Sequence, residues 1–304
     1  MITIRQTFLS PNIPVINISN MNIELKISLD FGPRILFCGF LEGPNHFFNR
    51  QSDLVNYSNE QESFHFFGGH RLWAAPEDPV FSYIPDNHPV TWLQKDSSVI
   101  FSQFVKVPHF ALSKELEIQI HPTLPQVEVI HRITNLDDQP IELAAWAISQ
   151  MAPGGLAVIQ LPKRGSHIGN LLPTSSLVLW PYTDLSDSRW RWGYEFIRVQ
   201  QDMTITKPLK FGLASDQGWL AYFNHGQMFQ KQTHVQPSAN YPDRGTPIQI
   251  FLDGDFLELE TMGPLQRLNP GQTITHQETW HLVSDCPPPR NAQQIKDILE
   301  KLET

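Results

Sequence analysis

A period-two alternation of apolar and polar residues in the middle of the chain constrains the fold more than any other feature. Between residues 112 and 121, every second side chain falls on the same side of an extended chain, and that side carries Leu112, Leu116, Ile118 and Ile120. This pattern is typical of a half-buried β-strand. Further strands are expected at residues 23–29, 98–107, 126–135, 141–151 and 273–283. Many strands joined by turns predict an all-β, antiparallel fold.

The composition favours short strands over long helices, since the 304 residues include 25 prolines and eight tryptophans. One helical stripe is visible, formed by Ile295, Ile298, Leu299 and Leu302. We expect a helical appendage at about residues 290–303, a long polar loop at residues 42–63 and mostly irregular chain at residues 225–245. Because no repeat or linker divides the sequence, residues 1–304 are expected to form a single domain.

Charge and cysteine content narrow the expected partners and compartment. The formal net charge of −9 argues against nucleic acid and anionic membranes as partners, because both select basic surfaces. No apolar run approaches the length of a membrane span, and no secretory signal is visible. Cys38 and Cys286 are expected to be free thiols in a reducing compartment. These features predict a cytoplasmic protein and leave its oligomeric state open.

The first candidate site lies in residues 64–79, FHFFGGHRLWAAPEDP. Its two glycines allow a sharp turn or a close approach of the backbone to a ligand. They are followed by His70, Arg71 and Trp73, which offer a proton carrier, a forked cationic donor and a flat apolar platform. That set would suit a ring-shaped ligand rich in hydroxyls. The alternative is a buried turn in which Trp73 belongs to the core and Arg71 braces a carboxylate.

The second candidate site lies in residues 256–262, FLELETM. Period-two geometry places Glu258 and Glu260 on one face of a strand and the leucines on the other. If the carboxylate face meets solvent, the two groups only make the surface polar. If it lines a cleft, burial raises the pKa of one carboxyl group, which can then act as a general base.

These motifs resemble those of the galactose mutarotase-like superfamily. Residues 259–261 (LET), followed by 268–272 (LNPGQ) and a closing strand, are similar to the end of that superfamily, where a Leu-Glu-Thr strand supplies the catalytic base. Residues 68–73 (GGHRLW) are similar to its sugar-binding Gly-Gly or Gly-x-x-Arg segment, and residues 32–35 (GPRI) resemble its N-terminal hairpin. The resemblance spans residues 20–285 and implies a β-supersandwich whose concave sheet binds saccharide.

The resemblance also implies a mechanism. In aldose 1-epimerases a carboxylate removes the proton of the C1 hydroxyl while an acid, usually histidine, protonates the ring oxygen. Glu260 matches the base. The position of the usual acid falls at or near Trp146, which cannot act as an acid, so His70 becomes the candidate acid, with His65 and His225 as alternatives. No metal or organic cofactor is implied, and the spacing of the histidines does not predict a metal site.

Further saccharide contacts follow from the same resemblance. Arg71 would clamp a hydroxyl or carboxylate group, and Trp73 would form a platform for the ring. The other candidate contacts are His65, Glu258, Arg34, Lys231 and Asp243.

Three functional hypotheses follow. The first is an aldose 1-epimerase-like mutarotase or epimerase acting on a sugar or sugar derivative. The second is a carbohydrate-binding protein without turnover, motivated by Trp146 at the acid position. The third is a lyase step on a uronic-acid-type sugar, in which Arg71 would bind the substrate carboxylate through two hydrogen bonds.

Overall fold

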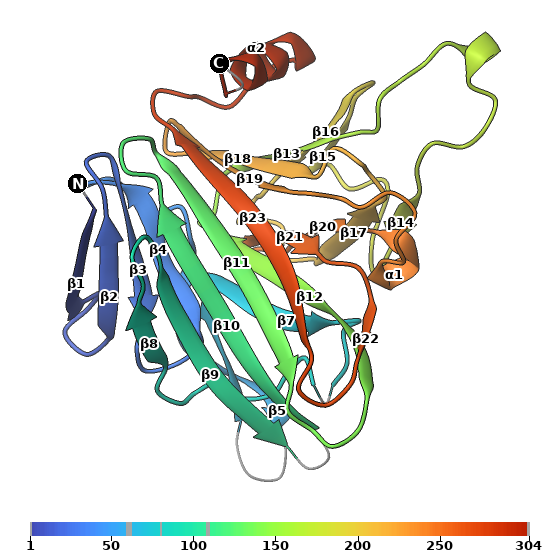
Figure 1. The fold of residues 1–304 in the computed structure, drawn as a ribbon. Coiled ribbons are helices and arrows are strands. Elements are labelled where there is room, and N and C mark those ends of the chain that lie inside the picture. The colour runs from blue at the N-terminus through green and yellow to red at the C-terminus, as the bar shows by residue number, and fades with distance from the viewer. Residues whose placement is uncertain (1, 59–62, 80, 108–109, 303–304) are drawn as a thin grey trace.

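Two large antiparallel β-sheets pack face to face and form most of the molecule (Figure 1). The structure, a computed structural model, describes residues 2–58, 63–79, 81–107 and 110–302. The all-β sandwich expected from the alternation is confirmed, and so is the short C-terminal helix, α2 (Ala292–Leu302).

The first sheet has eleven strands. Its main path runs in the order β1 (Thr3–Phe8), β2 (Pro14–Ser19), β3 (Ile23–Ser28), β4 (Arg34–Phe40), β7 (His70–Ala75), β12 (Ile141–Met151), β21 (Leu257–Met262), β20 (Ile248–Leu252), β17 (Leu209–Leu213) and β14 (Leu177–Leu179). The remaining strand, β22 (Gln266–Leu268), pairs with one end of β12.

The second sheet has ten strands. They run in the order β15 (Trp190–Trp192), β16 (Phe196–Gln200), β13 (Leu156–Gln160), β18 (Trp219–Asn224), β19 (Gln227–Thr233), β23 (Thr273–Val283), β11 (Gln126–Asn135), β10 (Phe110–Ile120), β9 (Val99–Val107) and β8 (Thr91–Gln94). A separate two-stranded ribbon joins β5 (Asn49–Ser58) to β6 (Ser63–Gly68). Two one-turn elements complete the chain, the 3₁₀ turn η1 (His167–Gly169) and α1 (Pro242–Gly245).

Apolar side chains from both sheets fill the space between them. Leu72 and Leu259 of the first sheet belong to the same buried cluster as Val129 and Leu282 of the second. Alternation places these residues on the inner faces of the two sheets. Their neighbours in sequence therefore point away from the space between the sheets. A second cluster lies under α2, where Ile295 is buried. Among the described residues, no helix is long and apolar enough to cross a membrane.

The structure corrects two expectations about irregular chain. Residues 49–58 form a strand where a loop was expected, and residues 59–62 of that stretch lie outside the described residues. Residues 227–233 form β19, although residues 225–245 were expected to be mostly irregular. Both strands are rich in polar residues, so their sequences do not show the alternation of apolar and polar residues. One polar residue of β19, Lys231, is buried, and its charge is paired inside the core.

One segment stands clear of the sandwich. Every residue from 163 to 177 is exposed, and Figure 1 shows this stretch projecting from the body between β13 and β14. Two side-chain hydrogen bonds and one backbone hydrogen bond hold it at its base. Arg164 Nε donates to the carbonyl of Tyr194 (2.8 Å), Ser175 Oγ to the carbonyl of Ala214 (2.6 Å), and the backbone N–H of Ala214 to the carbonyl of Ser176 (2.9 Å). The returning chain beyond it leads to Trp180 and Tyr182, which contribute to the site described next.

Candidate functional site

The two motifs expected to carry the chemistry lie on strands separated only by β12. In the first sheet β7 pairs with one edge of β12 and β21 with the other. Ile148 of β12 therefore faces Arg71 on one side and Glu260 on the other. Residues that alternate along these three strands point to opposite sides of the sheet. One side lines a cavity, and the other meets the second sheet.

The cavity, which we call the aromatic pocket, has a volume of about 490 Å³. Its walls come from β6, β7, β12, β17, β20 and β21, together with the segments after β7, β14 and β20. Aromatic side chains dominate its lining: Phe66, Trp73, Tyr83, Trp146, Trp180, Tyr182, Phe251 and Phe256. Flat apolar rings of this kind stack well on the apolar face of a ring-shaped ligand.

Glu258 lies on the wall of this pocket and has two partners. Arg71 Nη2 donates to its Oε1 at 2.9 Å, and Gln150 Nε2 donates to the same oxygen at 2.8 Å. The guanidinium of Arg71 also lies over the ring of Trp73, 4.4 Å from its centroid. Yet Arg71 Nε and Nη1 and Trp73 Nε1 are buried without a hydrogen-bond partner. The β7 wall of the pocket therefore offers three unused N–H donors.

Glu260 is fully buried directly beneath the pocket lining. Its Oε2 accepts from Trp146 Nε1 at 2.9 Å and from Lys210 Nζ at 3.1 Å, and both donors line the pocket. Its Oε1 has no hydrogen-bond partner. Burial raises the pKa of Glu260 to about 7, against the lowering effect of Lys210. A carboxyl group titrating near neutral pH is well suited to proton transfer.

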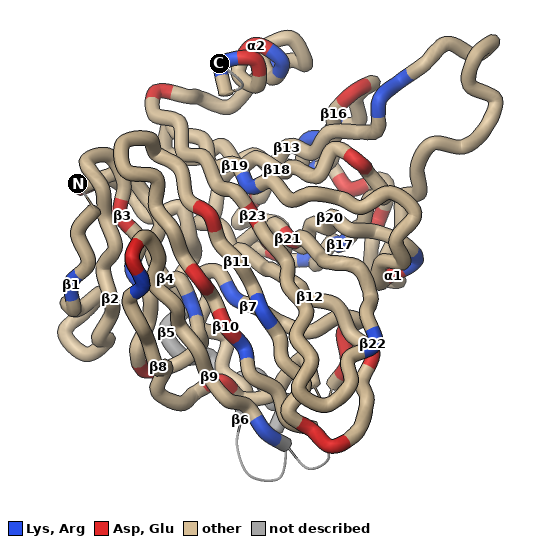
Figure 2. The backbone as a smooth tube through the Cα atoms, in the orientation of Figure 1, with Lys and Arg blue, Asp and Glu red and all other residues tan. Residues whose placement is uncertain are grey.

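Lys210 was missed in the sequence and is the main addition to the site. Its ammonium group lies 4.6 Å from the ring of Trp146 and 4.9 Å from that of Trp180. Figure 2 shows basic positions on β7 and β17 near acidic ones on β21, among strands that carry few charges. A feature of the sequence could have indicated Lys210: it lies in the otherwise apolar strand LKFGL, where Lys210 and Gly212 alternate with three apolar residues.

His70 lies on the opposite face of β7 and does not reach the pocket. Together with six neighbours it forms what we call the intersheet cluster, a buried polar group between the two sheets: His70, His131, Ser149, Lys231, Thr261, His276 and Glu278. His70 Nε2 is 2.8 Å from His131 Nε2, and its Nδ1 is 2.8 Å from Ser149 Oγ. Both ring nitrogens are therefore engaged, and burial holds the pKa of His70 well below its usual value. The acid role expected for His70 does not fit this position.

The hydrogen bonds of the intersheet cluster have one consistent direction. The carbonyl of His276 can only accept, so His131 Nδ1 carries the proton at this 3.0 Å contact. His131 Nε2 then accepts from His70 Nε2, and His70 Nδ1 accepts from Ser149 Oγ. Lys231 Nζ donates to Ser149 Oγ at 3.2 Å. All of these polar groups are satisfied with neutral histidines.

A metal ion fits this cluster poorly, although the ligand atoms of His70, His131 and Glu278 lie within 4.8 Å of one another. The ammonium of Lys231 is already 2.7 Å from Glu278 Oε1. Two nitrogens bound to one tetrahedral zinc would also be roughly 3.3 Å apart, wider than the 2.8 Å between the two imidazoles. Lys231 supplies the positive charge that Glu278 needs, and it holds the pKa of that carboxyl group well below its usual value despite burial.

The other predicted contacts also lie outside the pocket lining. Arg34 is buried and donates to Asp86 at 2.8 Å and to the carbonyl of Gly68 at 3.1 Å. His65 stacks on Phe67, and Asp243 accepts from Gln249 Nε2 at 2.7 Å. Lys231 belongs to the intersheet cluster. His225, the remaining histidine considered as the acid, is exposed in the turn after β18.

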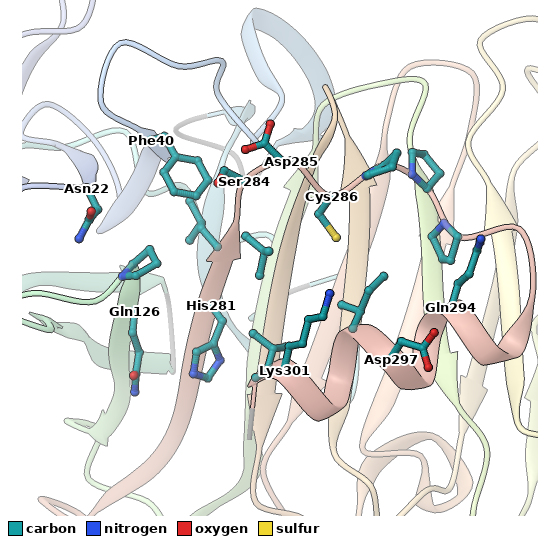
Figure 3. Close-up of a pocket in the computed structure, with 18 of the residues that line it drawn as sticks. Asn22, Phe40, Gln126, His281, Ser284, Asp285, Cys286, Gln294, Asp297 and Lys301 are labelled. Atoms are coloured by element: carbon teal, nitrogen blue, oxygen red, sulfur yellow. The ribbon is translucent and has the colours of Figure 1, made fainter. Parts of the chain in front are cut away.

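A larger cavity of about 1110 Å³ lies at the other end of the sandwich, between α2 and the ends of β11 and β23. Figure 3 shows Lys301 of α2 near Cys286 and His281 in this cavity. It contains none of the predicted site residues. The smaller aromatic pocket is lined by Glu258, lies over Glu260 and contains the unpaired donors of Arg71 and Trp73, so we take it as the candidate functional site.

Comparisons with known proteins bear on the fold. No protein-family model and no curated sequence matches the chain. Among solved structures, a galactose mutarotase-like protein from Lactobacillus casei is 10% identical, with a TM-score of 0.54, over 88% of this chain and 99% of that one. A galactose mutarotase-like protein from Clostridium acetobutylicum is 10% identical, with a TM-score of 0.55, over 93% and 99%.

A third match is a TPR-domain containing protein from Parabacteroides distasonis, 13% identical with a TM-score of 0.60. The match covers 95% of this chain, which spans about half (54%) of that longer protein. At these identities the likeness concerns architecture. The chain has the fold of the galactose mutarotase-like proteins.

Proposed function

We propose that the protein binds a saccharide in the aromatic pocket and interconverts its anomers, as an aldose 1-epimerase-like isomerase. The observation that carries the proposal is Glu260, a buried carboxyl group with one unpaired oxygen and a raised pKa beneath an aromatic cavity. Such a group can take up and return a proton near neutral pH.

In the proposed reaction Glu260 Oε1 accepts the proton of the C1 hydroxyl, and Lys210 gives a proton to the ring oxygen. The C1–ring oxygen bond breaks, the C1–C2 bond rotates in the open-chain aldehyde, and both protons return when the ring closes. Lys210 takes the place that the sequence analysis gave to His70, since it lines the pocket and contacts Glu260. Arg71 holds the sugar through its unused N–H donors, Trp73 through its ring face and its unused N–H, and Glu258 through its carboxylate.

Exchange NMR on a panel of aldoses tests this proposal. The wild-type protein is expected to accelerate anomer exchange, and Glu260→Gln and Lys210→Met are each expected to remove most of the acceleration. Asp216→Asn, a change of the same kind in an exposed turn, is the matched control and is expected to keep it. Exchange that stays at the uncatalysed rate with every aldose contradicts the proposal, provided that circular dichroism shows a folded protein.

Saccharide binding without turnover is the second candidate. It is favoured by one observation: among the described residues, no histidine lines the aromatic pocket. The same samples distinguish the two functions, because a protein that only binds will shift or broaden sugar resonances while leaving anomer exchange unchanged.

A further inference from the structure

The charges around the aromatic pocket do not balance. Its lining includes two cations, Arg71 and Lys210, and three carboxylates, Glu77, Asp253 and Glu258, with Glu260 beneath. Arg71 is paired with Glu258 and Lys210 with Glu260. These pairs leave the negative charges of Glu77 and Asp253 uncompensated.

Among the described residues, the donors that bind these two carboxylates are neutral. Glu77 accepts a hydrogen bond from the hydroxyl of Tyr83. Asp253 Oδ1 accepts from the backbone N–H groups of Asp255 (2.8 Å) and Phe256 (3.2 Å). Among the described residues, no cationic side chain forms an ion pair with either carboxylate. The pocket therefore presents an excess of negative charge to a ligand.

The aromatic walls act in the same direction. Lys210 lies over the rings of Trp146 and Trp180, and Arg71 lies over those of Trp73 and Phe66, with centroid distances from 4.4 to 5.5 Å. The faces of aromatic rings carry partial negative charge and attract cations. The rings of Tyr182 and Phe251 also line the pocket.

We propose that the saccharide bound in the aromatic pocket carries a positive charge, and that the substrate class is the amino sugars, whose protonated amine would lie against the aromatic walls and the carboxylates of Glu77 and Asp253. The inference rests on the proposed saccharide-binding function. It also makes the uronic-acid hypothesis unfavourable, because a substrate carboxylate would meet this negative excess.

The test is a set of matched titrations followed by calorimetry or NMR, at low ionic strength and at a pH where the amine is protonated. The ligands are glucosamine, glucose, N-acetylglucosamine and glucuronate, with the corresponding galactose series, because the configuration of the sugar is open. We expect each amino sugar to bind at least about fivefold more tightly than its neutral parent, the effect of a single cation–π contact. Glucuronate and galacturonate should bind most weakly.

Two variants tie the preference to the residues. Glu77→Gln and Asp253→Asn are each expected to reduce severalfold the ratio of the amino-sugar affinity to the affinity for the neutral parent. Asp216→Asn, at a remote turn, should change neither affinity. Added salt should reduce the preference as well, since it screens the attraction between charges.

The outcomes separate this inference from the proposed function. Equal or weaker binding of the amino sugars, with neutral aldoses bound and interconverted, overturns the inference and leaves the function intact. A preference that persists in both variants overturns the assignment to Glu77 and Asp253. If none of the sugars in either series binds, the proposed function is contradicted, and so is this inference.

Discussion

The two faces of the same three strands carry two buried polar groups of opposite character. On the inner face, the intersheet cluster leaves no buried side-chain nitrogen or oxygen of its seven residues without a partner. On the outer face, Arg71, Trp73 and Glu260 all retain unpaired buried atoms next to a cavity. Burial and charge alone therefore do not identify a site, because both groups have them. Incomplete hydrogen bonding beside a cavity sets the outer group apart from the inner one, since unpaired groups in a folded protein are costly and need an explanation.

The contrast is sharpest at two adjacent residues. His70 and Arg71 are neighbours in the chain, yet one is enclosed between the sheets and the other lines the pocket. Four predictions follow from treating the inner group as structural and the outer group as functional.

The largest expected effect is on stability, from the inner face. Lys231→Met removes the ion-pair partner of Glu278 and leaves its charge in the core with hydrogen bonds from Thr261 and Trp280, so we expect the free energy of unfolding to fall by about 3–5 kcal/mol. Urea denaturation followed by circular dichroism measures it. A loss below 1 kcal/mol would show that the cluster does not have the structural role assigned to it.

The next effect is on activity, from the outer face. Glu260→Gln should reduce anomer exchange at least about 10²-fold, the typical contribution of a positioned acid or base. The same change should not lower the unfolding free energy at pH 8, because it replaces a buried charge by a neutral group of the same shape. A variant that loses stability as strongly as Lys231→Met would remove the distinction between the two faces.

The pH dependence of stability should have opposite signs for the two groups. The folded pKa values of His131 and His276, about 4 and about 3, lie below the ordinary 6.5, so their contribution is present above pH 6.5 and is lost as the pH falls towards 4. The folded pKa of Glu260, about 7, lies above the ordinary 4.5, so its contribution is present below pH 4.5 and is lost as the pH rises to 7.

Chemical denaturation of the wild type and of Glu260→Gln across this range separates the two contributions. The difference in unfolding free energy should change between pH 4.5 and 7 by about 1.4 kcal/mol for each pH unit at most. A difference that is constant with pH would show that Glu260 does not titrate as inferred.

The smallest effect concerns the partner of Glu260. Trp146→Phe removes the N–H that stabilises the ionised carboxylate, so the apparent pKa of the base in the pH–rate profile should rise by up to about one unit. The maximum rate should change little. An unchanged profile would indicate that another group sets the pH dependence.

The alternation of residues predicted much of this architecture. The strands at residues 126–135, 141–151 and 273–283 have the predicted bounds; the first and the last bury one face more than the other, and residues 143–151 are buried on both faces. Alternation also predicted that Glu258 and Glu260 share a face, and the structure confirms it. It could not show which face of β7 meets the pocket, and a shift of one residue exchanges the roles of His70 and Arg71.

Other features depend on contacts between distant segments. The ion pair of Lys231 with Glu278 joins two strands of the second sheet. Without knowledge of that pairing, Lys231 was predicted to contact the saccharide. The resemblance placed the usual acid of the superfamily at or near the position of Trp146, and the indole N–H of Trp146 binds Glu260. Local pattern indicates which residues are chemically able to act, and tertiary packing decides which of them meet a ligand.

The three indoles of the pocket have a practical consequence. Trp73, Trp146 and Trp180 line it, out of eight tryptophans in the chain. Any molecule that enters must approach at least one of these fluorophores or displace the cation resting on it, so occupancy should alter the intrinsic emission of the protein. The intrinsic tryptophan fluorescence of the site therefore reports binding, and a library of sugars can be screened by titration without a label or an assumed reaction.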